Sequence, residues 1–322
     1  MELVKQQQPR IAVLLPCYNE EAAIGATVEG FRKAFPNATI YVYDNNSRDK
    51  TKAVATKAGA VVRTETQQGK GHVVRRMFAD IEADVYLMAD GDLTYDAGAA
   101  PRMAKLIVDE QLDMVVGIRR HEAVEAYRGG HVLGNKLFTR LLSGLFGRSF
   151  TDIFSGYRAF SRRFVKSFPV LSEGFEIETE MSVHALELRM PVGEIETRYG
   201  ARPEGSHSKL STFRDGWRIL KTIATLYRVE RPVLFYGGIG GLLLVAAMLL
   251  AVPLVATFIQ TGLVPRFPTA ILVTGMTIIA VLCFFAGLIL DTVTRGRREM
   301  RRLAYLALPA PGVSTVDDLH HL

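Results

Sequence analysis

The chain has 322 residues, of which 39 are Lys or Arg and 33 are Asp or Glu, giving a formal net charge of +6. This length allows one globular domain of roughly 200–250 residues and a further segment. The two cysteines have no disulfide or metal-ligand spacing, which excludes a cysteine framework. We attribute the basic excess to an arginine-rich region beside apolar segments near the C-terminus, so nucleic acid is not an expected partner.

Short apolar runs alternate with amphipathic stretches in the first part of the chain. The expected strands are Ile11–Leu15, Thr39–Tyr43, Ala60–Arg63, Val85–Ala89 and Met114–Gly117. This alternation predicts an α/β domain with a mainly parallel sheet. Polar side chains follow the first, second and fourth runs, where ligands of such sheets bind.

The next part of the chain mixes helical patterns with one more strand. Helices are expected at Val132–Phe146 and Glu178–Leu188, and a strand at Val192–Tyr199. A polar loop, Gly200–Ser211, leads into Thr212–Arg231, where aromatic and basic residues alternate. A helix of this character beside a membrane span suits the bilayer interface, and the alternative is an ordinary surface helix packed on the domain.

Two apolar runs, Val233–Ile259 and Thr269–Leu290, each exceed the roughly 20 residues needed to cross a bilayer. Pro253 inside the first run is tolerable in a membrane helix. The segment Arg295–Arg302 is rich in arginine, whereas the connecting loop has only Arg266, so the positive-inside rule predicts a cytoplasmic tail and a cytoplasmic N-terminal domain. The first ten residues are polar and lack the apolar core of a signal peptide, so no export of this domain is expected.

The expected organisation has four parts. They are a cytoplasmic catalytic domain at 1–210, an amphipathic juxtamembrane helix at 211–232, two transmembrane helices at 233–292 and a basic cytoplasmic tail at 293–322.

The motif Asp90-Gly91-Asp92 directly follows the expected strand Val85–Ala89. Alternate carboxylates at a strand end bring two hard oxygen ligands toward one divalent cation, which favours Mg²⁺ or Mn²⁺ together with substrate phosphates. Gly91 is expected to let a ligand approach the backbone. The alternative is a solvated turn without a ligand.

The strand ends carry neither of two common nucleotide fingerprints. Pro16-x-Tyr18-Asn19-Glu20 stands where a dinucleotide-binding fold would have Gly-x-Gly-x-x-Gly, and Gly69-Lys70-Gly71 lacks the spacing of a P-loop. A hydride-transfer enzyme or an NTPase is therefore disfavoured. Tyr18 is instead a candidate support for a base or ribose and Asp44 a candidate acceptor, while Lys70 is expected near acidic groups; the alternatives are a helix cap at Asn19 and a turn at Asp44.

These motifs occur in a particular order. They are Pro16-x-Tyr18-Asn19-Glu20, then Asp44 with Ser47, Asp49 and Thr51, then Gly69-Lys70-Gly71, then Asp90-x-Asp92. This order resembles the GT-A domain of inverting family-two glycosyltransferases. The later segments Ser155–Arg158, Glu176–Glu180 and Arg202 to Lys209 resemble the dolichol-phosphate mannose synthase and polyprenyl-phosphate glycosyltransferase branch, and the resemblance covers roughly residues 10–232.

The resemblance implies a GT-A, Rossmann-like fold and a metal-dependent enzyme that transfers a sugar from a nucleotide-sugar to polyprenyl phosphate with inversion. The expected nucleotide-sugar-binding residues are Pro16, Tyr18, Glu20, Val42, Asp44, Lys70, Asp90, Gly91, Asp92, Arg202 and Lys209. Asp90 and Asp92 are the implied ligands of Mg²⁺ or Mn²⁺. Asp92, Arg119 and Arg128 are the expected catalytic residues, the arginines orienting the acceptor phosphate. The membrane is a further partner, and a homo-oligomer is compatible with this organisation.

Two departures from the family pattern bear on the donor. Asn45 replaces a second acidic residue, and Thr94 stands where some mannose synthases have a metal-binding Gln. A UDP-hexose or UDP-N-acetylhexosamine is therefore favoured, with a GDP-mannose-dependent mannose synthase as the alternative. Other rivals are a processive synthase, which would need Gln-x-x-Arg-Trp rather than Arg214-Asp215-Gly216-Trp217, an enzyme with a soluble or protein acceptor, and a scaffold, which would be expected to lose Asp90 or Asp92.

Overall fold

The computed structural model describes residues 9–121, 150–174, 176–203 and 227–312, together with Gly144, Lys221, Ala224 and Thr225. The chain divides into two compact units. One consists of Met1–Gly216 with Arg301–Leu322, and the other of Trp217–Met300.

The first unit is built on a sheet covered by helices. Its strands are β1 (Ile11–Cys17), β2 (Thr39–Asp44), β3 (Val61–Thr64), β4 (Val85–Met88), β5 (Met114–His121), β6 (Arg158–Ser161) and β7 (Val192–Tyr199). Its helices are α1 (Ile24–Ala34), α2 (Thr51–Lys57), α3 (Lys70–Asp80), the short 3₁₀ helix η1 (Ala97–Ala99), α4 (Ala100–Asp109), α6 (Arg162–Ser167) and α7 (Ile177–Glu187).

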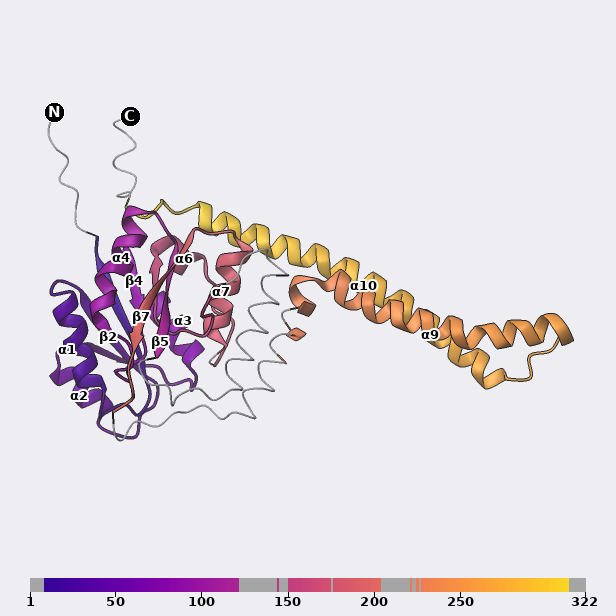
Figure 1. Ribbon diagram of the computed structural model, residues 1–322, viewed down its shortest axis with the longest axis horizontal. Helices are drawn as coiled ribbons and strands as arrows, with labels where there is room; N and C mark the ends of the chain where they lie inside the picture. Colours follow the sequence, from indigo (N-terminus) through magenta and orange to yellow (C-terminus); the bar gives the residue numbers. More distant parts are fainter. Residues whose placement is uncertain are drawn as a thin grey trace, which may run out of the picture. The chain divides into compact units, whose positions relative to one another are not determined.

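The strands form one sheet in the order β3-β2-β1-β4-β6-β5-β7 (Figure 1). All neighbouring pairs are parallel except those of β6, which runs antiparallel to both β4 and β5. The predicted α/β class and mainly parallel sheet are confirmed. Strand β6 was not predicted, because this short central strand begins with the fully buried Arg158 and shows no continuous apolar run.

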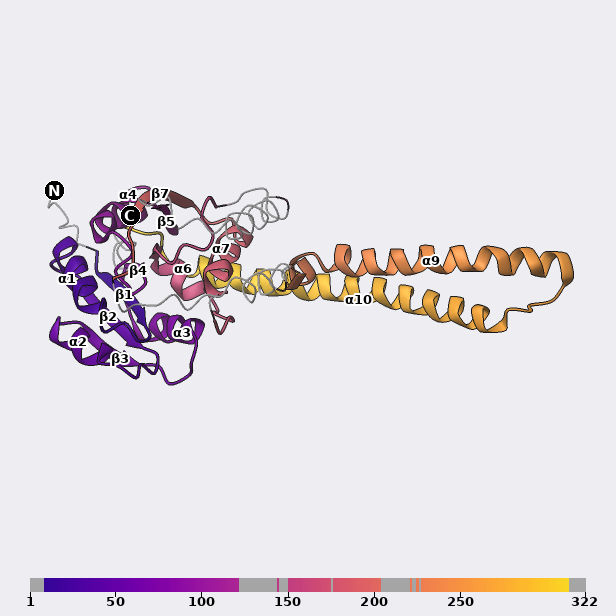
Figure 2. The same cartoon turned by 60° about the horizontal axis from the view of Figure 1, so that its bottom comes forward.

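Helices cover both faces of the sheet. Helices α1, α2 and α4 lie on one face, and α3, α6 and α7 on the other (Figure 2). A hydrophobic core cluster fills the first face, where Val28 and Phe31 of α1 and Met103 of α4 pack with Val13 and Leu87 of the strands. Amphipathic helices bury one stripe in this way, and the carboxyl ends of β1, β2 and β4 remain at one edge of the sheet.

Most predicted elements within the described residues are present with small shifts of their ends. The helix expected at Glu178–Leu188 is α7, and the strand expected at Val192–Tyr199 is β7. The helix expected at Val132–Phe146 lies outside the described residues apart from Gly144, and so does most of the amphipathic segment Thr212–Arg231.

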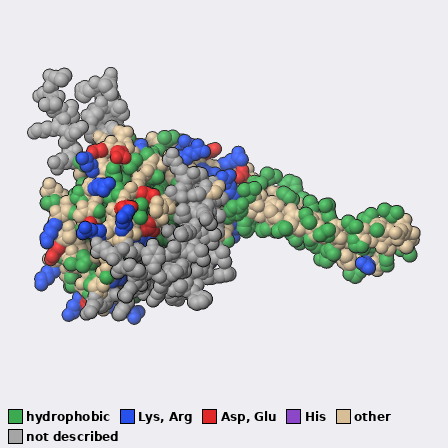
Figure 3. Space-filling model, in the orientation of Figure 1, with side chains coloured by type: hydrophobic (Ala, Val, Ile, Leu, Met, Phe, Trp, Pro, Cys, Tyr) green, Lys and Arg blue, Asp and Glu red, His purple; other side chains and the backbone are tan. Residues whose placement is uncertain are grey.

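The second unit contains α9 (Pro232–Thr261) and most of α10 (Phe267–Leu306). Both helices are long and apolar enough to cross a membrane, with a mean hydropathy of 2.8 and 2.5 over their apolar stretches. Hydrophobic side chains are spread along their visible surface, which shows very few charged side chains (Figure 3). The two helices pack through small residues, since an added Cβ on Gly240 would lie 2.8 Å from the Ala280 carbonyl oxygen. Close backbone approach of this kind is common between membrane helices.

Helix α10 extends beyond its apolar part. Its 40 residues correspond to about 60 Å at 1.5 Å per residue, roughly twice the hydrocarbon thickness of a bilayer. The residues expected to form a separate basic tail therefore continue the helix as far as Leu306. From Arg301 onward they belong to the first unit, where Arg301 forms a 2.6 Å ion pair with Glu187 of α7.

Candidate active site

The turns after β1 and β2 are joined by side-chain hydrogen bonds to the backbone. The Asn19 amide donates to Ser47 Oγ at 2.8 Å, and the Glu20 amide donates to Thr51 Oγ1 at 2.9 Å. In return the Arg48 amide donates to Asn19 Oδ1 at 2.8 Å. Asn19 has a φ of 52°, a left-handed conformation that asparagine tolerates better than most residues. The polar residues noted in both motifs therefore fix the shape of the sheet edge.

Asp44 ends β2 and is fully buried at this edge. Its Oδ2 accepts a hydrogen bond from the Ser47 amide at 3.1 Å and lies 3.5 Å from Lys52 Nζ. Its Oδ1 is buried and has no hydrogen-bond partner among the described residues. An unpaired buried carboxylate oxygen is costly, so this atom is set to accept a hydrogen bond from a ligand.

The other expected nucleoside residues are placed less uniformly. Pro16 is partly exposed near the end of β1, and Tyr18 and Glu20 follow that strand. Val42 is fully buried in the hydrophobic cluster, where its side chain has a packing role. Contact of these residues with a nucleoside stays a prediction.

Asp90 and Asp92 follow β4, and each is paired with a cation of the chain. Lys70 Nζ lies 2.5 Å from Asp90 Oδ1, and Arg202 Nη2 lies 2.8 Å from Asp92 Oδ2. Thr94 Oγ1 donates to Asp92 Oδ1 at 2.6 Å. Burial by itself would raise the pKa of Asp90, but the charges of Lys70, Arg202 and Arg119 outweigh it and hold this pKa below its ordinary value. Asp90 is therefore a carboxylate at neutral pH.

Packing requires a glycine at position 91, and the expected approach of a ligand to its backbone stays a prediction. A Cβ at this position would collide with Cys17 Sγ of β1, and Gly91 is itself buried. Thr27 Oγ1 of α1 also donates to the Gly91 carbonyl oxygen at 3.3 Å. The glycine thus lets the Asp90–Asp92 turn pack against the sheet, where Cys17 is buried.

Arg119 in β5 forms a bidentate ion pair with Asp152, with Nε to Oδ2 at 2.7 Å and Nη2 to Oδ1 at 2.8 Å. Its guanidinium also lies over the Tyr199 ring, 5.6 Å from the centroid. Burial would lower the pKa of Arg119, but the bonds to Asp152 raise it above the ordinary value. The expected phosphate-orienting role of Arg119 is thus shared with a structural pairing. Arg128 and Lys209 lie outside the described residues.

The segment Ser155–Arg158 packs next to Asp90 and is fixed by the buried Arg158. Arg158 is fully buried, and its guanidinium donates to the Ser155 and Ile153 carbonyl oxygens at 2.9 and 2.5 Å. Burial lowers the pKa of this guanidinium to about 10. An added Cβ on Gly156 would lie 2.8 Å from Asp90 Oδ2, so the glycine leaves space beside that oxygen.

Three contributors to the site were not predicted from the sequence. Glu178 forms a 2.6 Å ion pair with Lys70, Asp152 fixes Arg119, and Gly156 makes room at Asp90. The segments containing Gly156 and Glu178 carried the family resemblance, but nothing in their spacing identified a partner. Asp152 is a single acidic residue without a pattern around it, so no signal in one sequence singles it out.

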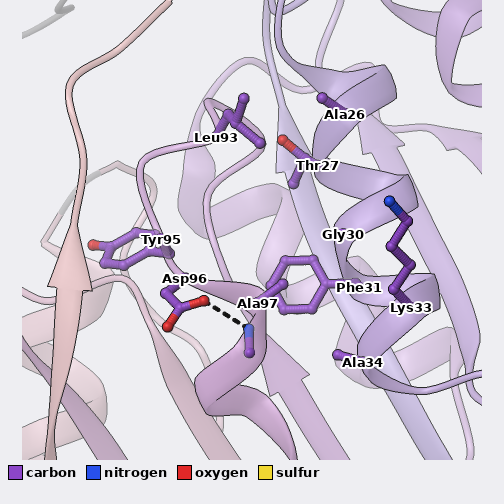
Figure 4. Close-up of a pocket in the computed structure, with 11 residues that line it drawn as sticks. Ala26, Thr27, Gly30, Phe31, Lys33, Ala34, Leu93, Tyr95, Asp96 and Ala97 are labelled. Carbon is purple, nitrogen blue, oxygen red and sulfur yellow. Dashed lines mark hydrogen bonds between the residues drawn. The ribbon is translucent and has the colours of Figure 1, made fainter.

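A pocket of about 480 Å³ lies beside the Asp90–Asp92 turn, between α1 and the loop that leads to η1. Figure 4 shows Leu93 and Thr27 at one end and Phe31 and Lys33 along α1. Asp96 accepts a 2.8 Å hydrogen bond from the Gly98 amide within this loop. None of the predicted site residues lines the pocket, so the volume is separate from the carboxylates.

The carboxylate oxygens of Asp90 and Asp92 fit a divalent metal ion that would also be bound by the oxygens of a diphosphate. Both residues offer hard carboxylate oxygens, and Gly156 leaves space at Asp90 Oδ2. In the described part of the chain no group of three or more His, Cys, Asp or Glu side chains is placed to hold a metal. Two carboxylates completed by phosphate oxygens are the usual protein contribution to a magnesium site.

The fold and the residues at the sheet edge define an enzyme of the GT-A type, which uses a nucleotide-sugar. Residues 12–168 match the family described as Glycosyl transferase family 2. The glycosyltransferase AglJ of Haloferax volcanii is 34% identical over 233 residues, which are 71% of this chain and 76% of AglJ. The chain belongs to glycosyl transferase family 2.

Other relatives agree with this assignment. An uncharacterized protein of Shigella flexneri is 56% identical over 153 residues, 48% of this chain and 94% of that protein. A dolichyl-phosphate hexose transferase of Haloferax volcanii is 28% identical over 221 residues, 69% of this chain and 95% of that enzyme. The fold is shared with glucosyl-3-phosphoglycerate synthase from Mycobacterium tuberculosis, solved with Mn²⁺, UDP-glucose and phosphoglyceric acid. That structure has a TM-score of 0.56 and 23% identity, covering 68% of this chain and 79% of the synthase.

Proposed function

We propose that this glycosyltransferase moves a hexose or N-acetylhexosamine from a UDP-sugar to a polyprenyl phosphate, with inversion, at the cytoplasmic face of a membrane. The observation that carries the proposal is the arrangement at the carboxyl edge of the sheet. There the buried Asp44 Oδ1 has no hydrogen-bond partner among the described residues, and Asp92 forms an ion pair with the partly exposed Arg202. Such an edge offers one acceptor to a nucleoside and one cation to a diphosphate.

The donor is held at three points in this proposal. Asp44 Oδ1 accepts a hydrogen bond from the nucleoside, and Tyr18 lies after the neighbouring strand as its support. Asp90 and Asp92 hold the divalent metal ion with the diphosphate. When bound, this ion supplies charge neutralisation for the leaving nucleoside diphosphate. Arg202, whose side chain is 30% exposed, exchanges Asp92 for the diphosphate.

The acceptor phosphate attacks the anomeric carbon from the face opposite the leaving group. A phosphate monoester is already anionic near neutral pH, so it needs orientation more than deprotonation. Arg119 lies near the carboxyl end of β5 with its charge partly balanced by Asp152, and Arg128 and Lys209 are the further candidates from the sequence. The dolichyl-phosphate hexose transferase relative and the two apolar helices both support a lipid acceptor.

Transfer to lipid is tested by incubating the purified full-length protein with UDP- and GDP-sugars and a polyprenyl phosphate. Mass spectrometry of the lipid is expected to show a mass increase of one sugar residue with a UDP-sugar. Product from GDP-mannose alone would replace the proposed donor. Equal transfer to a water-soluble acceptor without a prenyl chain would contradict the proposed acceptor.

Arg128→Ala separates acceptor use from donor binding. Loss of a charge near the acceptor phosphate is expected to lower the specificity constant for polyprenyl phosphate about ten- to a hundredfold, because a charge-assisted hydrogen bond is lost. Affinity for UDP, measured by titration calorimetry with Mn²⁺, is expected to stay unchanged. Undiminished lipid turnover in this variant would remove Arg128 from the acceptor site.

A further inference from the structure

Lys70 lies between two carboxylates of which only one belongs to the proposed metal site. Its Nζ is 2.5 Å from Asp90 Oδ1 and 2.6 Å from Glu178 Oε1, and its side chain is 9% exposed. Glu178 is equally inaccessible and has no part in the mechanism described above. Two carboxylate oxygens at hydrogen-bond distance on either side pair with the Lys70 side chain as an ammonium.

The backbone around Lys70 is fixed by the two glycines that flank it. A Cβ on Gly69 would collide with the Glu173 carbonyl oxygen, and a Cβ on Gly71 would collide with that of Ser172. The Gly71 amide donates to the Glu173 carbonyl oxygen at 3.0 Å. Gly69 also has a φ of 141°, a backbone conformation that residues other than glycine rarely adopt. The Gly-Lys-Gly sequence thus presses the start of α3 against the chain that precedes α7.

This fixed cation differs from Arg202. Arg202 contacts Asp92 through a side chain that is 30% exposed, whereas Lys70 is enclosed and bound at both sides. Two oxygens that contact one nitrogen lie close together. Without the ammonium, Asp90 Oδ1 and Glu178 Oε1 would form a pair of hard ligands suited to a divalent cation.

We propose that Lys70 is a positioning residue whose ammonium keeps a divalent cation out of the place between Asp90 and Glu178. It thereby leaves the Oδ2 side of Asp90, next to Gly156, for the metal that binds with the donor. This inference rests on the proposed metal-dependent transfer. It extends that function by giving the Gly-Lys-Gly motif a role in directing the metal rather than in contacting the nucleotide.

The test is Mn²⁺ binding to full-length Lys70→Met in detergent, measured without nucleotide from the electron paramagnetic resonance signal of free Mn²⁺. We expect affinity to rise about 10- to 100-fold over wild type, because two buried carboxylates lose their cation. With saturating UDP-sugar, kcat is expected to fall while KM for the donor changes little. Lys105→Met, which removes an exposed lysine paired with Asp109, is the control for net charge and is expected to bind Mn²⁺ as wild type does.

The double variant Lys70→Met/Glu178→Leu tests where the extra ion binds. Removing the second carboxylate is expected to return Mn²⁺ affinity to the wild-type level, because the extra ion then lacks one of its two ligands. The double variant is expected to fold, since replacing a buried ion pair by apolar residues is often tolerated. Unchanged Mn²⁺ affinity in a folded Lys70→Met, or tight binding that persists in the double variant, overturns the inference.

Glu178→Gln provides an independent test if Lys70→Met does not fold. The amide still accepts a hydrogen bond from Lys70, so Mn²⁺ binding in the presence of UDP is expected to stay at the wild-type level. A loss of about tenfold or more would make Glu178 a metal ligand and overturn the inference. Sugar transfer by the wild type reports separately on the proposed function, because the Mn²⁺ titrations without nucleotide do not depend on the donor or the acceptor.

Discussion

Asp92 makes three contacts that a neutral side chain would retain only in part. Its Oδ1 accepts hydrogen bonds from the Thr94 amide and from Thr94 Oγ1, while its Oδ2 forms an ion pair with Arg202. Asp92→Asn keeps the shape and one acceptor oxygen, so the protein is expected to fold, but the lost charge should lower transfer about 100-fold or more. The measurements are lipid-linked product formation and thermal unfolding.

Asp96→Asn is the matched control for Asp92→Asn. It removes the same charge four residues further on, from an exposed side chain that accepts a hydrogen bond from Gly98. Transfer by this variant is expected to be normal. Full activity of Asp92→Asn, or of wild type in excess chelator, would argue against a metal held by these carboxylates.

Arg119 and Arg120 are adjacent in β5 and offer a comparison between an enclosed and an open ion pair. The side chains of Arg119 and Asp152 are 26% and 10% exposed, whereas those of Arg120 and Glu196 are 69% and 54% exposed. Arg119→Met should cost about 2–3 kcal/mol because Asp152 loses two charge-assisted hydrogen bonds. Arg120→Met should cost less than about 1 kcal/mol. Unfolding of both full-length variants at pH 7 measures the difference, and equal losses would contradict it.

The same pair gives a pH dependence whose sign follows from Asp152. Burial would raise the pKa of Asp152, but the bonds to Arg119 hold it below the ordinary value of 3.8. This pairing therefore stabilises wild type above about pH 4 and is lost as the pH falls through the lowered pKa. Without Arg119, burial raises the pKa of Asp152. The deficit of Arg119→Met is then expected to shrink toward pH 4, and a deficit that grew on acidification would be inconsistent with this pairing.

At the scale of elements, the end of α10 is fastened to the sheet domain through Asp113. This fully buried carboxylate binds Arg163 and Ser161, and Tyr305 Oη donates to its Oδ2 at 2.8 Å. The Arg163 guanidinium lies over the Tyr305 ring, 4.8 Å from its centroid. The helix end is therefore held by a hydrogen bond and by ring stacking together.

Substitutions at Tyr305 separate these two contacts. Tyr305→Phe should lose about 1 kcal/mol, the usual net value of a hydrogen bond, since the ring still covers Arg163. Tyr305→Ala should lose the stacking too, worth roughly 0.5–1 kcal/mol more. Hydrogen exchange of the amides near Leu303 measures the release of the helix end. Equal protection in wild type and both variants would show that other contacts hold it.

At the scale of the whole chain, the two long helices and the arrangement of arginines predict the orientation. A connecting loop with one arginine is expected on the outer side, and the sheet domain with the arginine-rich end of α10 in the cytoplasm. In a chain whose two native cysteines are replaced by alanine, a membrane-impermeant thiol reagent should label Val264→Cys in right-side-out vesicles. Lys57→Cys should be labelled only in inverted ones. The reverse pattern would place the active site outside.

The local patterns of the sequence determined the fold class, the strands of the parallel part of the sheet and the two apolar helices. Period and length carry that information, because each strand or helix must bury its own apolar face. The polar residues after β1, β2 and β4 were also found in advance, since strand ends of such a sheet share one edge. What the sequence left undetermined was which charges meet there.

Those meetings depend on contacts between residues far apart in the chain. Lys70 reaches Glu178, Arg119 reaches Asp152, and Tyr305 reaches Asp113 across the fold. The strand β6 was also hidden, because its buried Arg158 is satisfied by the nearby carbonyl oxygens of Ser155 and Ile153 together with Ser182 Oγ of α7, which only the tertiary structure brings to it. A single sequence records that these charges exist. Only the packing of the chain decides which of them are neutralised in the interior, because a buried charge is stable only where an opposite charge or a set of hydrogen-bond partners surrounds it.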